Sequence, residues 1–86
     1  MSDVSSKVRE IVAGCGEFAV DVRQIKDSSD LYAAGLSSFA SVQIMLAIEE
    51  AFDVEFPDSL LNRRTFQSIE SIAAAVEGIL SEAVGQ

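Results

Sequence analysis

The chain has 86 residues, enough for one small domain with a modest core, and we expect that single domain to span residues 1–86. Fourteen acidic residues against six basic ones give a net charge of −8, which repels phosphate backbones and argues against nucleic-acid binding. No apolar run approaches the roughly 18 residues that a membrane span requires, and the N-terminus has no apolar signal core, so we expect a cytoplasmic protein.

A first helix is predicted from about Asp3 to Cys15. Its apolar residues recur at three- and four-residue steps and form one stripe: Val4, Val8, Ile11, Val12 and Cys15. Ser2 or Asp3 can cap the start of this helix, and Gly14 and Gly16 mark its end. Because Cys15 is the only cysteine, no internal disulfide can form, and a buried, inert thiol is favoured.

A long connection follows, from about Gly16 to Ser37. Apolar residues are spread through it, so we expect it to lie on the core: Val20, Val22, Ile25, Leu31 and Tyr32. Its segment DSSDLYAAG, residues 27–35, can form a turn or two of helix, since a structureless loop of this length would be unusual in a compact domain.

A second helix is predicted from about Ser38 to Phe52. The residues that follow helical spacing are Phe39, Val42, Met45, Leu46, Glu49 and Phe52, with Ile44 and Ile48 on the flank. Acidic residues gather near its end: Glu49, Glu50, Asp53 and Glu55. Acids at a helix C-terminus oppose the helix dipole, so a role in partner docking is attractive, although a merely solvated face explains them equally well.

The segment DVEFPDSLLNRR predicts a turn and a short third helix. Pro57 suits the first helical position, where its fixed φ fits and no amide donor is needed. Asp58 in the first turn and Arg63 and Arg64 in the last turn would complement the helix dipole. The two arginines are alternatively exposed candidates for partner specificity.

The last helix is predicted from about Ile69 to Leu80, with Ser68 as its cap. Its apolar stripe consists of Ile69, Ile72, Ala73, Val76, Ile79 and Leu80. No segment alternates in the manner of a strand. The sequence therefore predicts an all-α bundle of three longer helices and one short helix.

Two serines stand at the start of the second helix, in a chain with no histidine to activate either as a nucleophile. The chain also lacks HExxH, CxxC, Walker and GxGxxG patterns, so we predict neither catalytic residues nor a metal site. Ser37 suits the N-cap position, which contributes ~1 kcal/mol. Ser38 then takes the first helical position with its hydroxyl outward, where free amides and the helix dipole favour an attached phosphate. Ser38 could thus be the substrate of another enzyme that places a phosphoryl group on it.

The stretch DLYAAGLSSFASVQIMLAIEEAFDVEFPDSLL, followed by TFQSIESIAAAV, resembles the acyl carrier proteins and their peptidyl (aminoacyl) carrier relatives. The residues at the positions of the family pattern are Asp30, Leu31, Gly35, Ser38, Phe39, Glu49, Glu50, Phe52, Phe56, Pro57, Phe66, Ser68 and Ile69. The match runs from Asp30 to Val76 at consistent spacing, whereas the first helix agrees only in position and periodicity.

The resemblance implies an acyl-carrier-like four-helix bundle in which Ser38 carries a 4′-phosphopantetheine arm through a phosphodiester. A phosphopantetheinyl transferase would install the arm from coenzyme A with magnesium, and its thiol would hold an acyl or aminoacyl group as a thioester. The implied partners are an acyl- or aminoacyl-activating ligase and acyltransferase or synthase enzymes, with the carrier itself a monomer and not an enzyme. Ser37 is the rival attachment site, but the three-residue step from Gly35 and the adjoining Phe39 match only with Ser38.

The chain departs from fatty-acid carriers around this serine. Those carriers usually have Asp where Ser37 stands, and acids early in the second helix where this chain has Ala40 and Gln43. A dedicated carrier in lipid or secondary-metabolite synthesis, or one for an activated amino acid, therefore fits better than a housekeeping fatty-acid carrier. No residue decides among these cargoes.

The predicted docking surface for partner enzymes consists of Ser37, Phe39, Val42, Glu49, Glu50, Arg63 and Arg64. If an acyl cargo folds inward, the space between the second and last helices should open near Val42, Leu46 and Ile72, whereas a small amino acid needs no such pocket. The alternative function is an unmodified helical interaction module that keeps a carrier-like scaffold for docking.

Overall fold

The computed structural model describes residues 3–15 and 25–84. Its elements are helix α1 (Asp3–Cys15), helix α2 (Ser38–Phe52), the 3₁₀ helix η2 (Asp58–Leu60) and helix α3 (Ile69–Val84). The described residues contain no strand, and the predicted all-α bundle of three longer helices and one short helix is confirmed. The predicted bounds of α1 and α2 match, whereas α3 continues beyond Leu80 to Val84. Within the described residues, the helices all fall short of the length and apolarity needed to cross a bilayer.

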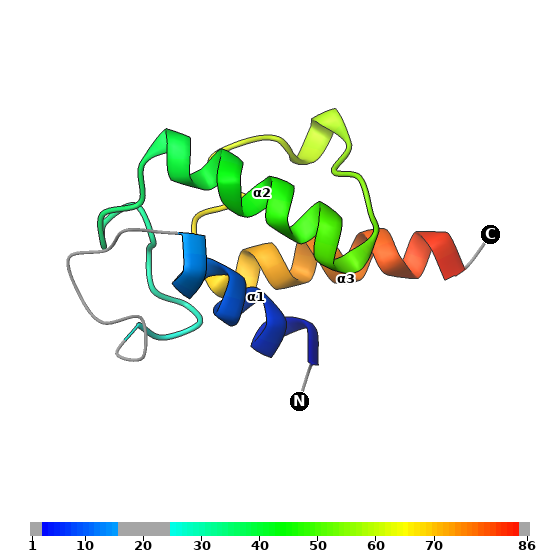
Figure 1. Cartoon of the computed structure of the whole chain (residues 1–86), viewed down its shortest axis with the longest axis horizontal. Helices are drawn as coiled ribbons and strands as arrows, with labels where there is room; N and C mark the ends of the chain where they lie inside the picture. Colours follow the sequence, from blue (N-terminus) through cyan, green and yellow to red (C-terminus); the bar gives the residue numbers. More distant parts are fainter. Residues whose placement is uncertain (1–2, 16–24, 85–86) are drawn as a thin grey trace.

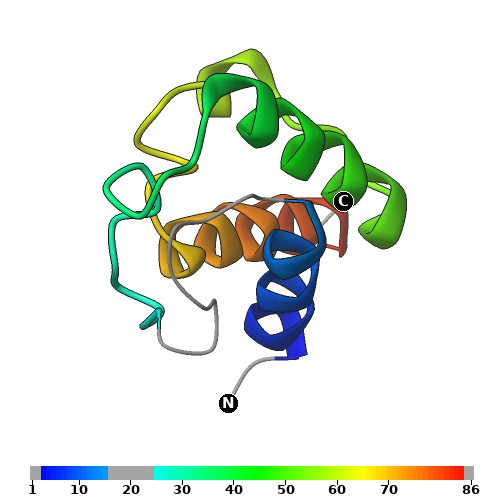
Figure 2. The same ribbon diagram turned by 60° about the vertical axis from the view of Figure 1, so that its left-hand side comes forward.

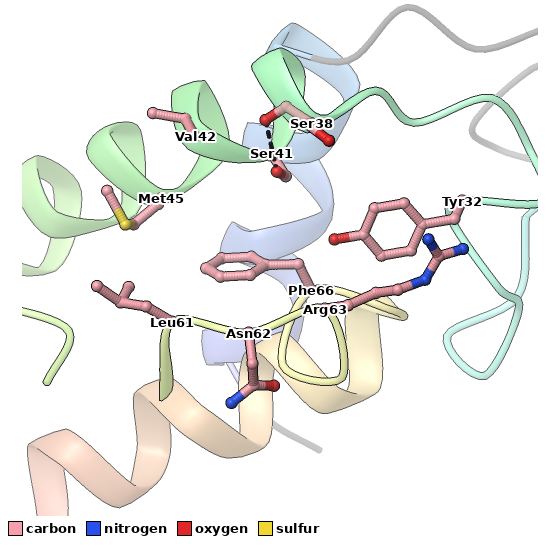
Figure 3. A pocket seen from close by; sticks show the side chains of 9 residues that line it. All are labelled: Tyr32, Ser38, Ser41, Val42, Met45, Leu61, Asn62, Arg63 and Phe66. Carbon is pink, nitrogen blue, oxygen red and sulfur yellow. Dashed lines mark hydrogen bonds between the residues drawn. The ribbon is translucent and has the colours of Figure 1, made fainter. Parts of the chain in front are cut away.

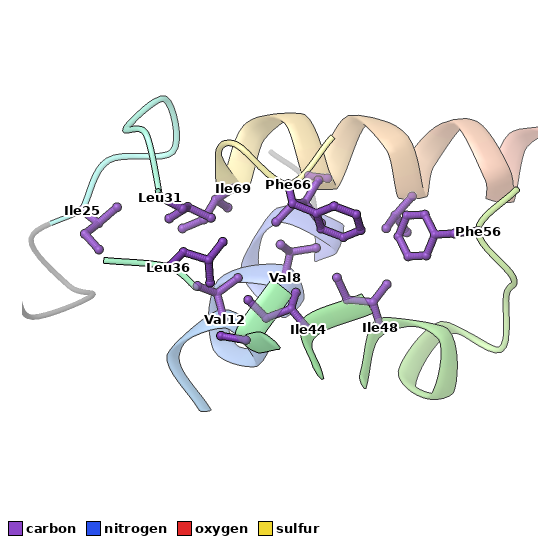
Figure 4. Packing of buried hydrophobic residues seen from close by; sticks show 14 residues of the cluster. Val8, Val12, Ile25, Leu31, Leu36, Ile44, Ile48, Phe56, Phe66 and Ile69 are labelled. Atoms are coloured by element: carbon purple, nitrogen blue, oxygen red, sulfur yellow. The ribbon is translucent and has the colours of Figure 1, made fainter. Parts of the chain in front are cut away.

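The three long helices surround one core (Figure 1). α1 packs against both α2 and α3, and α2 lies across the other two helices (Figure 2). Figure 4 shows the side chains that meet between them, with Val8 and Val12 from α1, Ile44 and Ile48 from α2, and Ile69 from α3. All five are completely buried. Each long helix therefore contributes branched aliphatic side chains to a shared interior.

The buried face of α2 differs from the predicted stripe. The buried residues are Ala40, Ile44 and Ile48, at four-residue steps, which places the predicted flank at the core. Three members of the predicted stripe are exposed: Phe39 by 73%, Val42 by 50% and Leu46 by 54%. Apolar residues occupy most of the circumference of α2, so helical spacing is satisfied by two faces and does not decide which one is buried.

The connection before α2 lies on the core, as predicted, with Ile25, Leu31 and Leu36 buried. Val20 and Val22 lie outside the described residues. Residues 27–35 form hydrogen-bonded turns rather than a continuous helix, because Asp30 Oδ1 accepts from the amide of Tyr32 at 2.9 Å and so closes a local turn. The connection is tied to the start of α3 by two backbone hydrogen bonds, Leu31 N–H to Gln67 O at 2.7 Å and Glu70 N–H to Asp27 O at 2.9 Å.

The short third helix is smaller than predicted. It is the three-residue 3₁₀ helix η2, and Pro57, with φ −69° and ψ 156°, lies before its first residue rather than within it. The helix ends before Arg63 and Arg64, so the interpretation of these arginines as complements of its dipole is wrong. The physical reason is Asn62, whose Oδ1 accepts from the Thr65 amide at 3.0 Å and turns the chain away from a helical path.

Helix α3 begins with the predicted cap. Ser68 Oγ accepts from the Ser71 amide at 3.0 Å, and Ser71 Oγ accepts from the Ser68 amide at 3.0 Å. This reciprocal pair satisfies two backbone donors that the helix start would otherwise leave unpaired. The predicted stripe is confirmed from Ile69 to Val76, where Ile69, Ile72 and Val76 are completely buried.

Candidate functional site

At the start of α2, Ser37 and Ser38 have different roles. Gly35 has φ 115°, a conformation that glycine adopts without strain, and it turns the chain into the helix. Ser37 is the N-cap residue, with φ −91° and ψ 163°, and its Oγ accepts from the Ala40 amide at 3.0 Å. The capping role predicted for Ser37 is therefore confirmed. Its hydroxyl oxygen is held against the helix and is occupied by the backbone.

Ser38 is the first residue of α2 and is exposed to solvent. Its amide and that of Phe39 belong to the first helical turn, whose donors have no acceptors within the helix. The positive end of the helix dipole lies at the same place, so a phosphodiester on Ser38 would be stabilised electrostatically. Ser41 Oγ donates to the Ser38 carbonyl at 2.7 Å and fixes this first turn. These residues fit a phosphate-linked group without rearrangement.

Ser38 opens onto a cavity of about 430 Å³, drawn in Figure 3. The lining residues are Tyr32, Ser38, Ser41, Val42, Met45, Leu61, Asn62, Arg63 and Phe66. Helix α2 forms one wall and residues 61–66 form the other, with Tyr32 from the connection closing one end (Figure 3). Ser38 lies toward the end of the cavity where Tyr32 and Arg63 are found, whereas Val42, Met45 and Leu61 lie toward the opposite, apolar end (Figure 3). A chain attached to Ser38 would thus have a hollow of mixed polarity beside it.

Arg63 and Tyr32 form a contact that no sequence pattern predicts. The guanidinium carbon of Arg63 lies 4.2 Å from the centroid of the Tyr32 ring, the geometry of a cation–π interaction (Figure 3). The two residues are far apart in sequence, and no spacing pattern links them. Only the position of residues 61–66 beside the connection brings them together.

The predicted docking residues divide into two groups in the structure. Ser37, Phe39, Val42 and Arg63 lie around the start of α2 or line the cavity beside it. Glu49 is on the same helix, eleven residues after Ser38. At 1.5 Å per residue, it lies about 16 Å further along the helix axis than Ser38. Phe39 and Val42, in the first two turns of α2, are exposed apolar residues. Leu46 and Leu61 are also exposed.

Glu49 has a structural partner. Its Oε2 accepts from the Phe56 amide at 2.9 Å in a partly buried hydrogen bond. The bond closes the turn after α2, where Asp53 takes the left-handed conformation with φ 54°. Glu50 and Arg64 are exposed, and Arg64 does not line the cavity. A structural role therefore accounts for Glu49, while Glu50 and Arg64 remain predicted docking residues.

The cavity does not coincide with the opening predicted for an inward-folding cargo. Val42 lines it, but Leu46 and Ile72 do not, and Ile72 is completely buried. Among the described residues, no group of three or more histidine, cysteine or acidic side chains is arranged to hold a metal ion. The features that gather at Ser38 are an exposed hydroxyl, a helix N-terminus, one cation and a partly apolar hollow.

Comparison with known proteins agrees with this arrangement. Residues 6–76 match the family model described as "Phosphopantetheine attachment site". The aminoacyl carrier protein of Agrobacterium fabrum is 58% identical over 77 residues, covering 90% of this chain and 93% of that protein.

Solved structures give the same result. One is a chain in the crystal structure of an engineered Bradyrhizobium japonicum glycine:[carrier protein] ligase complexed with carrier protein from Agrobacterium tumefaciens and ATP. That chain has 58% identity and a TM-score of 0.84, over 88% of this chain and 99% of that one. The holo acyl carrier protein of Nitrosomonas europaea has 30% identity and a TM-score of 0.78, over 94% and 99% of the two chains. The chain belongs to the phosphopantetheine-attachment family: it is a carrier protein, not an enzyme, and it holds acyl or aminoacyl groups as thioesters on covalently bound 4′-phosphopantetheine.

Proposed function

We propose that Ser38 bears the 4′-phosphopantetheine arm and that the cargo is an amino acid, delivered by an aminoacyl-adenylate-forming ligase. The attachment at Ser38 is supported by one observation, the different roles of the two serines. Ser37 Oγ is occupied by the Ala40 amide, whereas Ser38 is exposed at the helix start and opens onto the cavity. A transferase would form the phosphodiester at a hydroxyl that performs no structural task. The arm's thiol supplies the thioester chemistry, so this chain needs no base of its own.

The choice of an amino acid as cargo rests on the relatives. The aminoacyl carrier protein of Agrobacterium fabrum is 58% identical, and the structure with 58% identity contains a glycine:[carrier protein] ligase. The interior of this chain supports the same choice, because the helices meet through tightly buried isoleucine and valine side chains such as Ile44, Ile72 and Val76. A long acyl chain entering that interior would have to separate them, whereas a small amino acid on the arm would not. Glycine is the first amino acid to test.

The docking surface proposed for the ligase is the start of α2 and the neighbouring residues 61–64. Phe39 is exposed by 73%, and Val42 and Leu61 are exposed nearby. Exposed apolar side chains of this size next to an attachment point are typical of interaction sites. Arg63 and Arg64 would contribute positive charges at the rim, and Glu50 a negative charge at the far end of α2. Charged residues at a rim mostly set the association rate and the choice of partner.

The remaining parts of the proposal concern the protein's setting. We propose that residues 1–86 act as a single monomeric domain in the cytoplasm, modified by a phosphopantetheinyl transferase and passing its cargo to an acyltransferase or synthase. The net charge of −8 keeps such a small domain soluble and separate from its copies. A place in lipid or secondary-metabolite synthesis would follow from the enzyme that takes the cargo.

Mass spectrometry tests the attachment. The apo protein is incubated with coenzyme A, magnesium and a promiscuous phosphopantetheinyl transferase, and the gain of one arm is measured for the wild type, S38A and S37A. The wild type and S37A should gain the arm, and S38A should not. An arm on S38A, or no arm on the wild type, would overturn the proposal.

The cargo test starts from holo protein. Holo protein is incubated with the glycine ligase, ATP and single amino acids, and glycine should add its mass through a hydroxylamine-sensitive bond. A preference for fatty acids with their own ligases would contradict the aminoacyl assignment.

A further inference from the structure

We propose that Arg63, held over the ring of Tyr32, is a positioning residue for the arm: its guanidinium pairs with the phosphodiester on Ser38 and directs the arm into the cavity between α2 and residues 61–66. This inference rests on the attachment at Ser38 proposed above. It assigns roles to Arg63 and Tyr32 in addition to the role of Ser38 as the attachment residue.

The charges around the cavity carry the first step. Arg63 is the one charged side chain among the residues that line it. The chain as a whole has a net charge of −8, so a phosphodiester added to it meets a repulsive field almost everywhere. The residues that line the cavity beside Ser38 include a cation and no carboxylate. The phosphate should therefore be drawn toward Arg63.

The position of Arg63 supports the second step. Its guanidinium carbon lies over the Tyr32 ring, 4.2 Å from the ring centroid. A guanidinium has five N–H donors, so a contact with one ring leaves donors for phosphate oxygens. The contact also restricts the side chain of Arg63, so less freedom is lost when it pairs with the phosphate. Tyr32 thus keeps the guanidinium of Arg63 in place for the phosphate.

The shape of the cavity carries the third step. Tyr32 and Arg63 lie at the same end as Ser38, and Val42, Met45 and Leu61 line the other end (Figure 3). A pantetheine chain likewise begins at a charged phosphate and continues through methyl groups and amides. The volume of about 430 Å³ falls within the range of ordinary ligand cavities. The hold is weak enough for a partner to displace, since an exposed ion pair changes an equilibrium by about two- to fivefold.

Intrinsic fluorescence offers a direct readout, because Tyr32 is the only tyrosine and the chain has no tryptophan. The emission of apo and holo protein is compared for the wild type, R63Q and R64Q, with no partner enzyme present. Each holo sample is first checked by mass for one arm on Ser38. The wild type and R64Q should show a clear difference between apo and holo emission, and R63Q should lose most of it. Arg64 is the matched control, since it is the adjacent, exposed arginine that does not line the cavity.

Amide NMR shifts provide the second measurement. Attachment of the arm should shift the amides of residues 61–63 in the wild type and R64Q, with shifts smaller by up to about fivefold in R63Q. Y32L, which keeps the charge but removes the ring, should fall between them. Raising the salt from ~0.1 M to ~1 M should shrink the wild-type shifts, since the screening length falls from about 10 Å to about 3 Å. Equal shifts in R63Q and R64Q, with the arm present on both, would overturn the inference while leaving the attachment at Ser38 intact. Absence of the arm would instead contradict the proposed function.

Discussion

At the scale of single residues, the carboxylate of Glu49 has a task that its position in the sequence does not reveal. The sequence places Glu49 among the acids near the end of the second helix, where a solvated face and a docking face have the same pattern. In the structure, its Oε2 accepts from the Phe56 amide in a partly buried hydrogen bond. Phe56 lies beyond the end of α2 at Phe52, so the helical periodicity of the sequence does not identify this pair.

This bond predicts different outcomes for two neighbouring acids. E49A should lower the free energy of unfolding by about 1–2 kcal/mol, because the Phe56 amide loses a charged acceptor. E50A should change it by less than about 0.5 kcal/mol, since Glu50 is exposed. Urea denaturation followed by circular dichroism measures both. Equal stability of the two variants would mean that the hydrogen bond contributes nothing and that Glu49 is free for docking.

At the scale of elements, the sequence predicts most of the fold and both ends of α2. Capping residues and apolar periodicity were sufficient for the bounds of α1 and α2 and for the Ser68 cap, because these are local signals. The place just after a cap indicates Ser38 as a hydroxyl that can be modified, and the family resemblance, through Gly35 and Phe39, favours it over Ser37. The cavity beside Ser38 was not foreseen, because residues 61–66 reach that position only through tertiary packing.

Two element-level predictions were wrong for physical reasons. The predicted short helix is longer than η2, because the side chain of Asn62 competes with the backbone for the Thr65 amide and a propensity pattern does not include that competition. The face of α2 was misassigned because apolar residues also occupy the exposed side, at Phe39 and Leu46. Carrier proteins must present a surface to partners, so an apolar face need not be a buried face.

The assignment of the buried face of α2 can be tested with two truncations. I48A should lower the free energy of unfolding by about 2–5 kcal/mol, because Ile48 is completely buried and its loss leaves a cavity among α1, α2 and α3. L46A should change it by no more than about 0.5 kcal/mol, because Leu46 is 54% exposed. Thermal and urea denaturation of both variants gives the comparison. A larger loss from L46A than from I48A would restore the stripe predicted from the sequence.

At the scale of the whole molecule, the dominant electrostatic fact is the net charge of −8 on 86 residues. Like charges on a small domain repel one another and favour the expanded, unfolded chain. Among the described residues, Arg9 and Asp27 form an ion pair whose side chains are exposed by 32% and 55%. Exposed pairs contribute less than about 1 kcal/mol, so this one does not offset the general repulsion.

Added salt should therefore stabilise the domain. Between ~0.01 M and ~0.15 M ionic strength the screening length falls from about 30 Å to about 8 Å, which weakens repulsion between distant acids. We expect the Tm, measured by calorimetry, to rise by a few degrees, since about 1 kcal/mol shifts the Tm of a domain this size by roughly 4–8 °C. E50K changes the net charge from −8 to −6 and should reduce the dependence of Tm on salt. The slope is the proper measure, because a lysine near the end of α2 also complements the helix dipole and raises Tm directly. A Tm that falls with salt would mean that attractive pairs such as Arg9 and Asp27 outweigh the net repulsion.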